Sequence, residues 1–198
     1  FIGFAAFSHC SGLTGSLTLP NKLKHIDGRA FAYCSGFNGD LNIPESIDCL
    51  YGGTFEGCSG LNGSLILHNN LKLLKTATSF NYDAIGTEGG QFRNCSFQGE
   101  LVLPASITTI PPSCFQGNLF SSISEIPEGL IDIGESAFAG CWRLSGVLEF
   151  PASLSSIRKS VFWGCSTLEG IILSSNISSI QEGAFAYCYD LNKIIHKH

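Results

Sequence analysis

One pattern of apolar and polar positions repeats along the whole chain. In its clearest form an aliphatic residue is followed by a small residue and phenylalanine, and a cysteine comes three positions later, as in Ile26, Ala30-Phe31 and Cys34. The phenylalanine recurs eight times, mostly at steps of 23 or 24 residues: Phe7, Phe31, Phe55, Phe92, Phe115, Phe138, Phe162 and Phe185. Seven copies keep the cysteine: Cys10, Cys34, Cys58, Cys95, Cys141, Cys165 and Cys188. Such a period predicts a solenoid of stacked coils.

The second half of each unit predicts a short strand. Leu17 and Leu19 alternate with Ser16 and Thr18, which gives a strand with one buried face, and Pro20 ends it. We expect the strands of successive coils to lie side by side in parallel, with the phenylalanines stacked inside. A single coil cannot close a core, whereas eight coils at roughly 4.8 Å each would form an array about 40 Å long.

A family resemblance follows from these motifs. The segment 133–141, Ile-Gly-Glu-Ser-Ala-Phe-Ala-Gly-Cys, resembles the BspA-like, or Treponema-type, leucine-rich repeat. The resemblance implies an α/β repeat solenoid of about eight coils: a right-handed superhelix with short parallel β-strands and a short helical turn after each Ala-Phe. It further implies an extracellular or cell-surface protein that adheres to host proteins.

The repeat organises the chain as one leucine-rich-repeat domain over residues 1–198 with an insertion at about 75–86. Insertions in solenoids map to loops on one face, which is often the binding face, so Phe80, Tyr82 and Asp83 are candidate binding residues. The pattern is already under way at Phe1. We therefore expect the chain to be part of a longer precursor, with its signal peptide and anchor outside the given sequence.

Composition and charge narrow the class of partner. Hydrophobic residues make up 44% of the chain and charged residues 14%, which is too apolar for a disordered protein. The net charge of −5 argues against a nucleic-acid partner, because binding a polyanion needs a basic excess. No apolar run approaches the roughly 18 residues that a membrane-spanning helix needs.

The cysteine column allows three interpretations. A metal site needs ligands that converge on a point, and disulfides need side chains that face each other, whereas an in-register column points its thiols the same way. The third interpretation, in which each cysteine is a small buried apolar residue, fits the spacing best. No phosphate loop, nucleophile elbow or metalloprotease motif is present. We therefore predict no catalytic residues, no metal and no cofactor.

Two groups of outward residues are candidates for binding. Between the glycine and the proline of each unit no lysine or arginine occurs, so the strand face should be mildly acidic, with Asp40, Glu100 and Glu149 as its candidate residues. The alternative is a solvated sheet with scattered acids. Trp142 and Trp163 lie beside the buried column and could anchor a partner, or could simply cover the edge of the solenoid.

These features favour a non-catalytic protein-binding or adhesion module, with a host extracellular-matrix or cell-surface protein as partner. Two alternatives stay open. The domain could be a structural spacer between other domains, or a carbohydrate-binding module of a surface glycan-handling complex that uses the edge aromatic residues.

Overall fold

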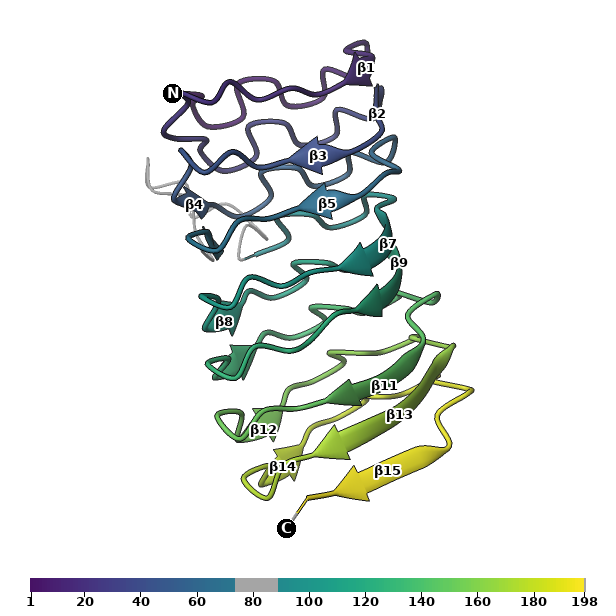
Figure 1. Ribbon diagram of the computed structural model, residues 1–198. Coiled ribbons are helices and arrows are strands. Elements are labelled where there is room, and N and C mark those ends of the chain that lie inside the picture. Colours follow the sequence, from purple (N-terminus) through teal and green to yellow (C-terminus); the bar gives the residue numbers. More distant parts are fainter. Residues whose placement is uncertain (74–88, 198) are drawn as a thin grey trace.

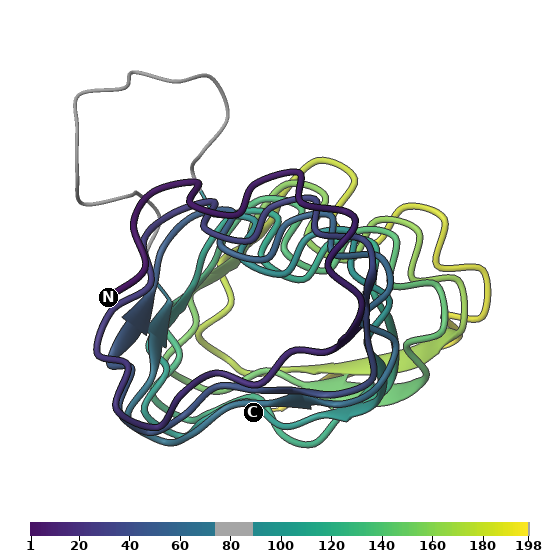
Figure 2. The same cartoon turned by 90° about the horizontal axis from the view of Figure 1, so that it is seen from above.

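Parallel strands stacked in successive coils form the fold. The computed structural model describes residues 1–73 and 89–197. The chain winds through about seven turns of a parallel β-solenoid, with the coils stacked from the N-terminus to the C-terminus (Figure 1). Viewed along the stack, the coils overlie one another around a common interior (Figure 2). The predicted insertion at 75–86 lies outside the described residues.

Two columns of short strands run along the solenoid (Figure 1). The first column contains β1 (Gly15–Ser16), β2 (Phe37–Asn38), β3 (Leu41–Asn42), β5 (Leu65–Ile66), β7 (Gln98–Leu101), β9 (Leu119–Ile123), β11 (Gly146–Glu149), β13 (Leu168–Leu173) and β15 (Lys193–His196). The second contains β4 (Cys49–Leu50), β6 (Lys72–Leu73), β8 (Thr109–Ile110), β10 (Asp132–Ile133), β12 (Ser156–Ile157) and β14 (Ser179–Ile180).

Strand pairing is parallel throughout the described chain. The first column is divided into four sheets, β1-β2, β3-β5, β7-β9 and β11-β13-β15, and the second into β4-β6, β8-β10 and β12-β14. Partners come from consecutive coils, as in Leu41 opposite Leu65. The parallel strands predicted from the repeat are thus confirmed, and a leucine-rich-repeat solenoid is the fold.

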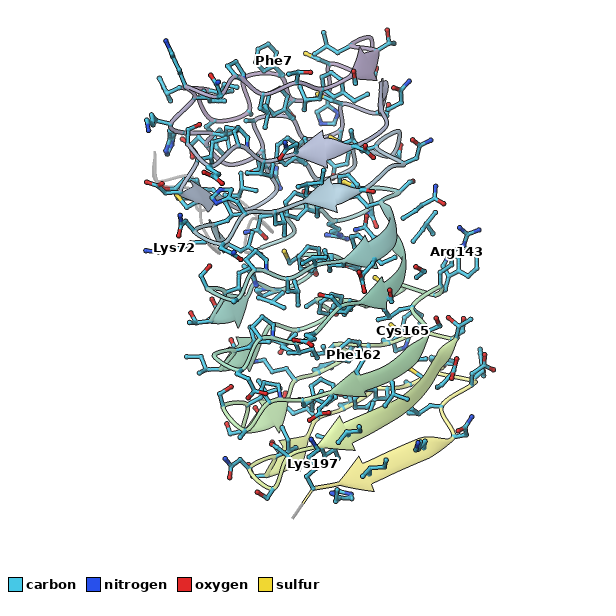
Figure 3. All side chains as sticks on the ribbon, in the orientation of Figure 1. Phe7, Lys72, Arg143, Phe162, Cys165 and Lys197 are labelled. Carbon is cyan, nitrogen blue, oxygen red and sulfur yellow. The ribbon has the colours of Figure 1, made fainter. Side chains whose placement is uncertain are left out.

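A continuous phenylalanine ladder fills the interior. The eight repeated rings stack nearly parallel on one another, with centroids 5.2–5.9 Å apart and interplanar angles of 1–19°. Each ring from Phe31 to Phe162 therefore packs against the rings of the coils before and after it. The six inner rings, from Phe31 to Phe162, are buried, whereas Phe7 in the first coil is 40% exposed. Figure 3 shows Phe162 among the inward side chains.

The cysteine column lies beside this ladder and does more than fill space. Five of its members, from Cys34 to Cys165, are buried, and all nine cysteines of the chain are free thiols. Each column thiol from Cys34 onward donates to the carbonyl oxygen of the phenylalanine in the preceding coil, over 2.9–3.3 Å. The sequence predicted the burial of these residues but not the hydrogen bonds, which join adjacent coils.

The turns around the phenylalanines are not helical. No helix occurs in residues 1–73 or 89–197, so the predicted helical turns do not form and the fold consists of strands and turns. The residues two before and two after every ladder phenylalanine have positive φ, such as Ser136 at 57° and Gly140 at 72° around Phe138. A left-handed residue interrupts a right-handed helix. The amide of Phe138 instead donates to Val161 in the next coil.

Candidate binding surface

We call the outward side of the first strand column the strand face. The alternation predicted from the sequence is confirmed there, because the predicted outward residues Ser16, Thr18, Asp40, Glu100 and Glu149 are exposed. The same side also exposes Asn42, Ser64, Ile66, Val102 and Glu125. Their neighbours along the strands, such as Leu41 and Leu101, are buried. The strand face therefore carries polar and acidic groups that the core does not need.

Asp40 has a structural role besides its exposure. Its Oδ1 accepts a hydrogen bond of 2.7 Å from the backbone N–H of Ser64, one coil further on. In the same turn, the side-chain oxygen of Asn62 accepts from the N–H of Gly39 over 3.1 Å. Asp40 thus joins two coils while contributing negative charge to the strand face.

Glu100 and Glu149 lie on the strand face in different sheets. Glu100, on β7, stands opposite Ser122 of β9. Glu149, on β11, forms an ion pair with Nζ of Lys197, which follows β15 two coils away, and both side chains remain more than half exposed. Figure 3 shows Lys197 near the end of this sheet. The pair partly offsets the acidic charge that the sequence predicted here.

A groove of about 640 Å³ hollows the strand face between β9 and β11. These strands are the facing edges of two separate sheets, β7-β9 and β11-β13-β15. The coils remain joined just before the groove, where the N–H and Oγ of Ser145 both donate to the carbonyl of Ser121 at 3.0 Å. The groove is lined by Ala105, Ile123, Ser124, Glu125, Ile126, Pro127, Glu128, Gly129, Val147, Leu148 and Glu149.

The two predicted tryptophans lie apart from the groove and differ in their surroundings. Trp142 is 49% exposed, and the Arg143 guanidinium lies 5.0 Å from the centre of its ring. Trp163 is 45% exposed and packs edge-on against Tyr187 at 5.1 Å, which in turn contacts Tyr189 at 6.2 Å. Neither tryptophan is among the residues that line the groove. The candidates Phe80, Tyr82 and Asp83 lie outside the described residues.

Comparison with known proteins identifies the repeat. The family model described as the BspA type leucine rich repeat region matches residues 1–87 and 84–198, with six copies. The chain belongs to the BspA-type leucine-rich repeat family. The resemblance inferred from the segment 133–141 is therefore confirmed. No curated protein matches the chain significantly.

Two solved structures of leucine-rich repeat proteins share the fold of this chain. A protein from Bacteroides ovatus ATCC 8483 is 28% identical, with a TM-score of 0.62, over 97% of this chain and 39% of that protein. The leucine-rich repeat protein of T. pallidum is 20% identical, with a TM-score of 0.65, over 84% of this chain and 71% of that protein. The chain thus spans about two fifths of the length of the Bacteroides protein.

The thiols and carboxylates of the described residues show what chemistry this BspA-type region offers. Burial raises the pKa of the Cys58 and Cys141 thiols to about 12, so these groups are protonated at neutral pH. Among residues 1–73 and 89–197, no three His, Cys, Asp or Glu side chains gather as a metal site would require. The same residues contain no helix of the length and apolarity that crossing a bilayer would demand.

Sequence reasoning missed Glu128, Lys197 and the groove itself. A signal was present in the spacing, because Pro127 follows Asn118 by nine residues whereas Pro151 follows Cys141 by ten. Between β11 and β13 a similar mismatch is absorbed by an irregularity in register at Gly146/Val147, and the strands stay paired. Between β9 and β11 the sheet opens instead. A change in the spacing between units can therefore indicate where a sheet could break. It does not predict whether the strands stay paired or separate.

Proposed function

We propose that this BspA-type domain is a non-catalytic protein-binding module of a cell-surface or secreted protein, and that the strand face contacts the partner. The observation that carries this proposal is the alternation of buried and exposed residues along each strand. Inward residues complete the core, while the outward positions hold exposed carboxylates such as Glu100 and Glu149. An exposed acidic face steers and orients a basic partner surface.

The family supports the location and the class of partner. BspA-type repeats are characteristic of surface modules, so an extracellular matrix protein or a host cell-surface protein fits the proposed partner. The acidic strand face further favours a partner with a basic patch. A structural spacer does not need an acidic surface, and it would show no saturable binding.

Binding to a panel of purified extracellular-matrix proteins tests the proposal, with biolayer interferometry as the readout. We expect saturable binding to at least one protein, and at least about a tenfold loss of affinity in a Glu100→Gln/Glu149→Gln double variant. A Glu135→Gln/Glu182→Gln variant removes two exposed carboxylates from the turns and is matched in charge. Absence of saturable binding, or equal losses in the two variants, would contradict a role for the strand face.

A second candidate function is glycan binding, because Trp163, Tyr187 and Tyr189 form one exposed aromatic cluster. Aromatic side chains combine large contact area with polar groups and can serve as binding platforms. A glycan array with wild-type protein and a Trp163→Ala/Tyr189→Ala variant tests it. Trp142→Ala is the control, because Arg143 lies over that ring. Silence of the wild-type protein on the array would remove this candidate.

A further inference from the structure

The groove between β9 and β11 has the form of a site for an extended chain. It lies between β11 and the end of β9 with the segment 124–129 that follows it, and its lining combines apolar and acidic side chains. Ile123 and Leu148 are buried in its floor, while Val147 at its rim is 44% exposed. A sheet edge presents backbone N–H and C=O groups that an added strand can pair with. The edge of β11 therefore offers main-chain partners as well as side chains.

The charge of the groove selects the partner's chemistry. Three of its eleven lining residues, Glu125, Glu128 and Glu149, are exposed carboxylates, and none is basic. Lys197, which reaches Glu149 from the chain after β15, supplies a balancing charge. Lys197 places an ammonium group on a groove carboxylate, in the way that a cationic side chain of a partner would.

We propose that the β9–β11 groove binds an extended, lysine- or arginine-containing segment of a partner protein. The segment lies along the groove, its backbone pairs with a strand edge, and its cationic side chains contact Glu125, Glu128 and Glu149. This assignment rests on the proposed protein-binding function and names the partner's chemistry within it. When the segment binds, its cations compete with Lys197 for Glu149.

Peptide titration tests the groove directly. The probe is a fluorescent nine-residue peptide of alternating lysine and valine, with blocked ends, and its binding to the whole chain is followed by fluorescence anisotropy. A peptide with glutamate in place of lysine is the charge control, and a lysine peptide that is N-methylated at every residue lacks the backbone donors for strand pairing on both of its edges. We expect only the unmodified lysine peptide to bind, more weakly as salt is raised.

Three variants locate the site. Glu125→Gln/Glu128→Gln should weaken the lysine peptide by about tenfold or more, whereas Glu135→Gln/Glu169→Gln, which removes two exposed carboxylates outside the groove lining, should change affinity less than about twofold. Lys197→Ala should tighten binding about two- to fivefold, because Glu149 loses its competing cation. These are conservative surface changes, and thermal melting shows whether each variant is folded.

Several outcomes would overturn the groove assignment. These are equal binding of the N-methylated peptide, equal losses in the two double variants, weaker binding in Lys197→Ala, or no binding of the lysine peptide. The proposed function would survive each of them if matrix-protein binding remained sensitive to Glu100→Gln/Glu149→Gln. Loss of both peptide and matrix-protein binding in the wild-type chain would remove the two proposals together.

Discussion

Asn118 occupies the place of a column cysteine and makes the same contact with Phe92. Its Nδ2 donates to the carbonyl oxygen of Phe92 in the preceding coil at 2.7 Å, and to that of Phe115 at 3.0 Å. Its Oδ1 accepts from the N–H of Phe97 at 3.2 Å. The one unit without a column cysteine thus keeps the donor. Donation to the previous coil, more than the sulfur atom, is the shared property of this position.

Replacing Asn118 by leucine should destabilise the fold. The side chain keeps a similar size but leaves buried backbone groups without their partner, which costs about 1–3 kcal/mol. Asn118→Cys should cost less, because a thiol can restore the bond to Phe92. Urea unfolding of the two variants measures the difference. Equal losses would show that packing, not donation, determines the residue at this position.

Truncation of the phenylalanine ladder should be far more costly than truncation at the surface. Phe138 is 1% exposed and stacks between Phe115 and Phe162, so Phe138→Ala should cost about 3–5 kcal/mol. Trp163 is 45% exposed, and Trp163→Ala should lose much less. Chemical unfolding of both variants tests this. Similar losses in the free energy of unfolding would mean that the phenylalanine ladder is not the main source of core stability.

The period and alternation of the sequence were enough to predict the stacked coils, the parallel strands and the inward ladder. These features depend on residues such as Phe138 and Leu41, whose burial recurs in every coil and so leaves a repeated mark in the sequence. The turns were predicted less well. Ser136 and Ser160 adopt positive φ although serine seldom does, because bonds between coils fix their backbone. These hydrogen bonds join residues of different coils, so the sequence of a single unit does not reveal them.

The candidate surface, too, was predicted only in part. The exposure of Asp40, Glu100 and Glu149 followed from alternation alone, since alternate residues of a strand face opposite sides. The groove and the pairing of Lys197 with Glu149 join residues from different coils. Their proximity depends on how neighbouring coils pack against each other, which the sequence of a single unit does not show.

Glycines at one repeat position offer a matched test of coil spacing. A Cβ on Gly60 would lie 2.2 Å from the carbonyl oxygen of Phe37 and 2.4 Å from that of Ser35. The equivalent Gly12, in the first coil, has nothing within 4 Å of the same position. Gly60→Ala must therefore push two coils apart and should cost at least about 1–3 kcal/mol, the usual cost of overpacking.

Gly12→Ala supplies the control for that change, and it should leave the melting temperature nearly unchanged. Differential scanning calorimetry of the two variants gives the comparison. If both alanines were tolerated equally, the coils would not approach each other as closely as the structure places them.

Alkaline pH should destabilise the solenoid through its buried thiols. Burial raises the pKa of Cys58 and Cys141 from 9.0 to about 12 and that of Cys95 well above 9.0, whereas the unfolded chain ionises its thiols near the ordinary value. Folded-state pKa values above the unfolded ones mean that stability is complete below about pH 9 and falls as pH rises toward 12. At pH 10 each such thiol should cost roughly 1 kcal/mol.

Urea unfolding at pH 7.5 and pH 10 measures this loss. Cys141→Asn supplies the control, because Asn118 shows that an amide can make the contact between coils and an amide does not ionise. The variant should lose less stability than the wild-type chain between the two pH values. An identical pH dependence in both would mean that groups other than the thiol at this position cause the alkaline loss. Since the thiols remain protonated while the solenoid is folded, their role is to hold adjacent coils together, and the exposed strand face is left to meet a partner.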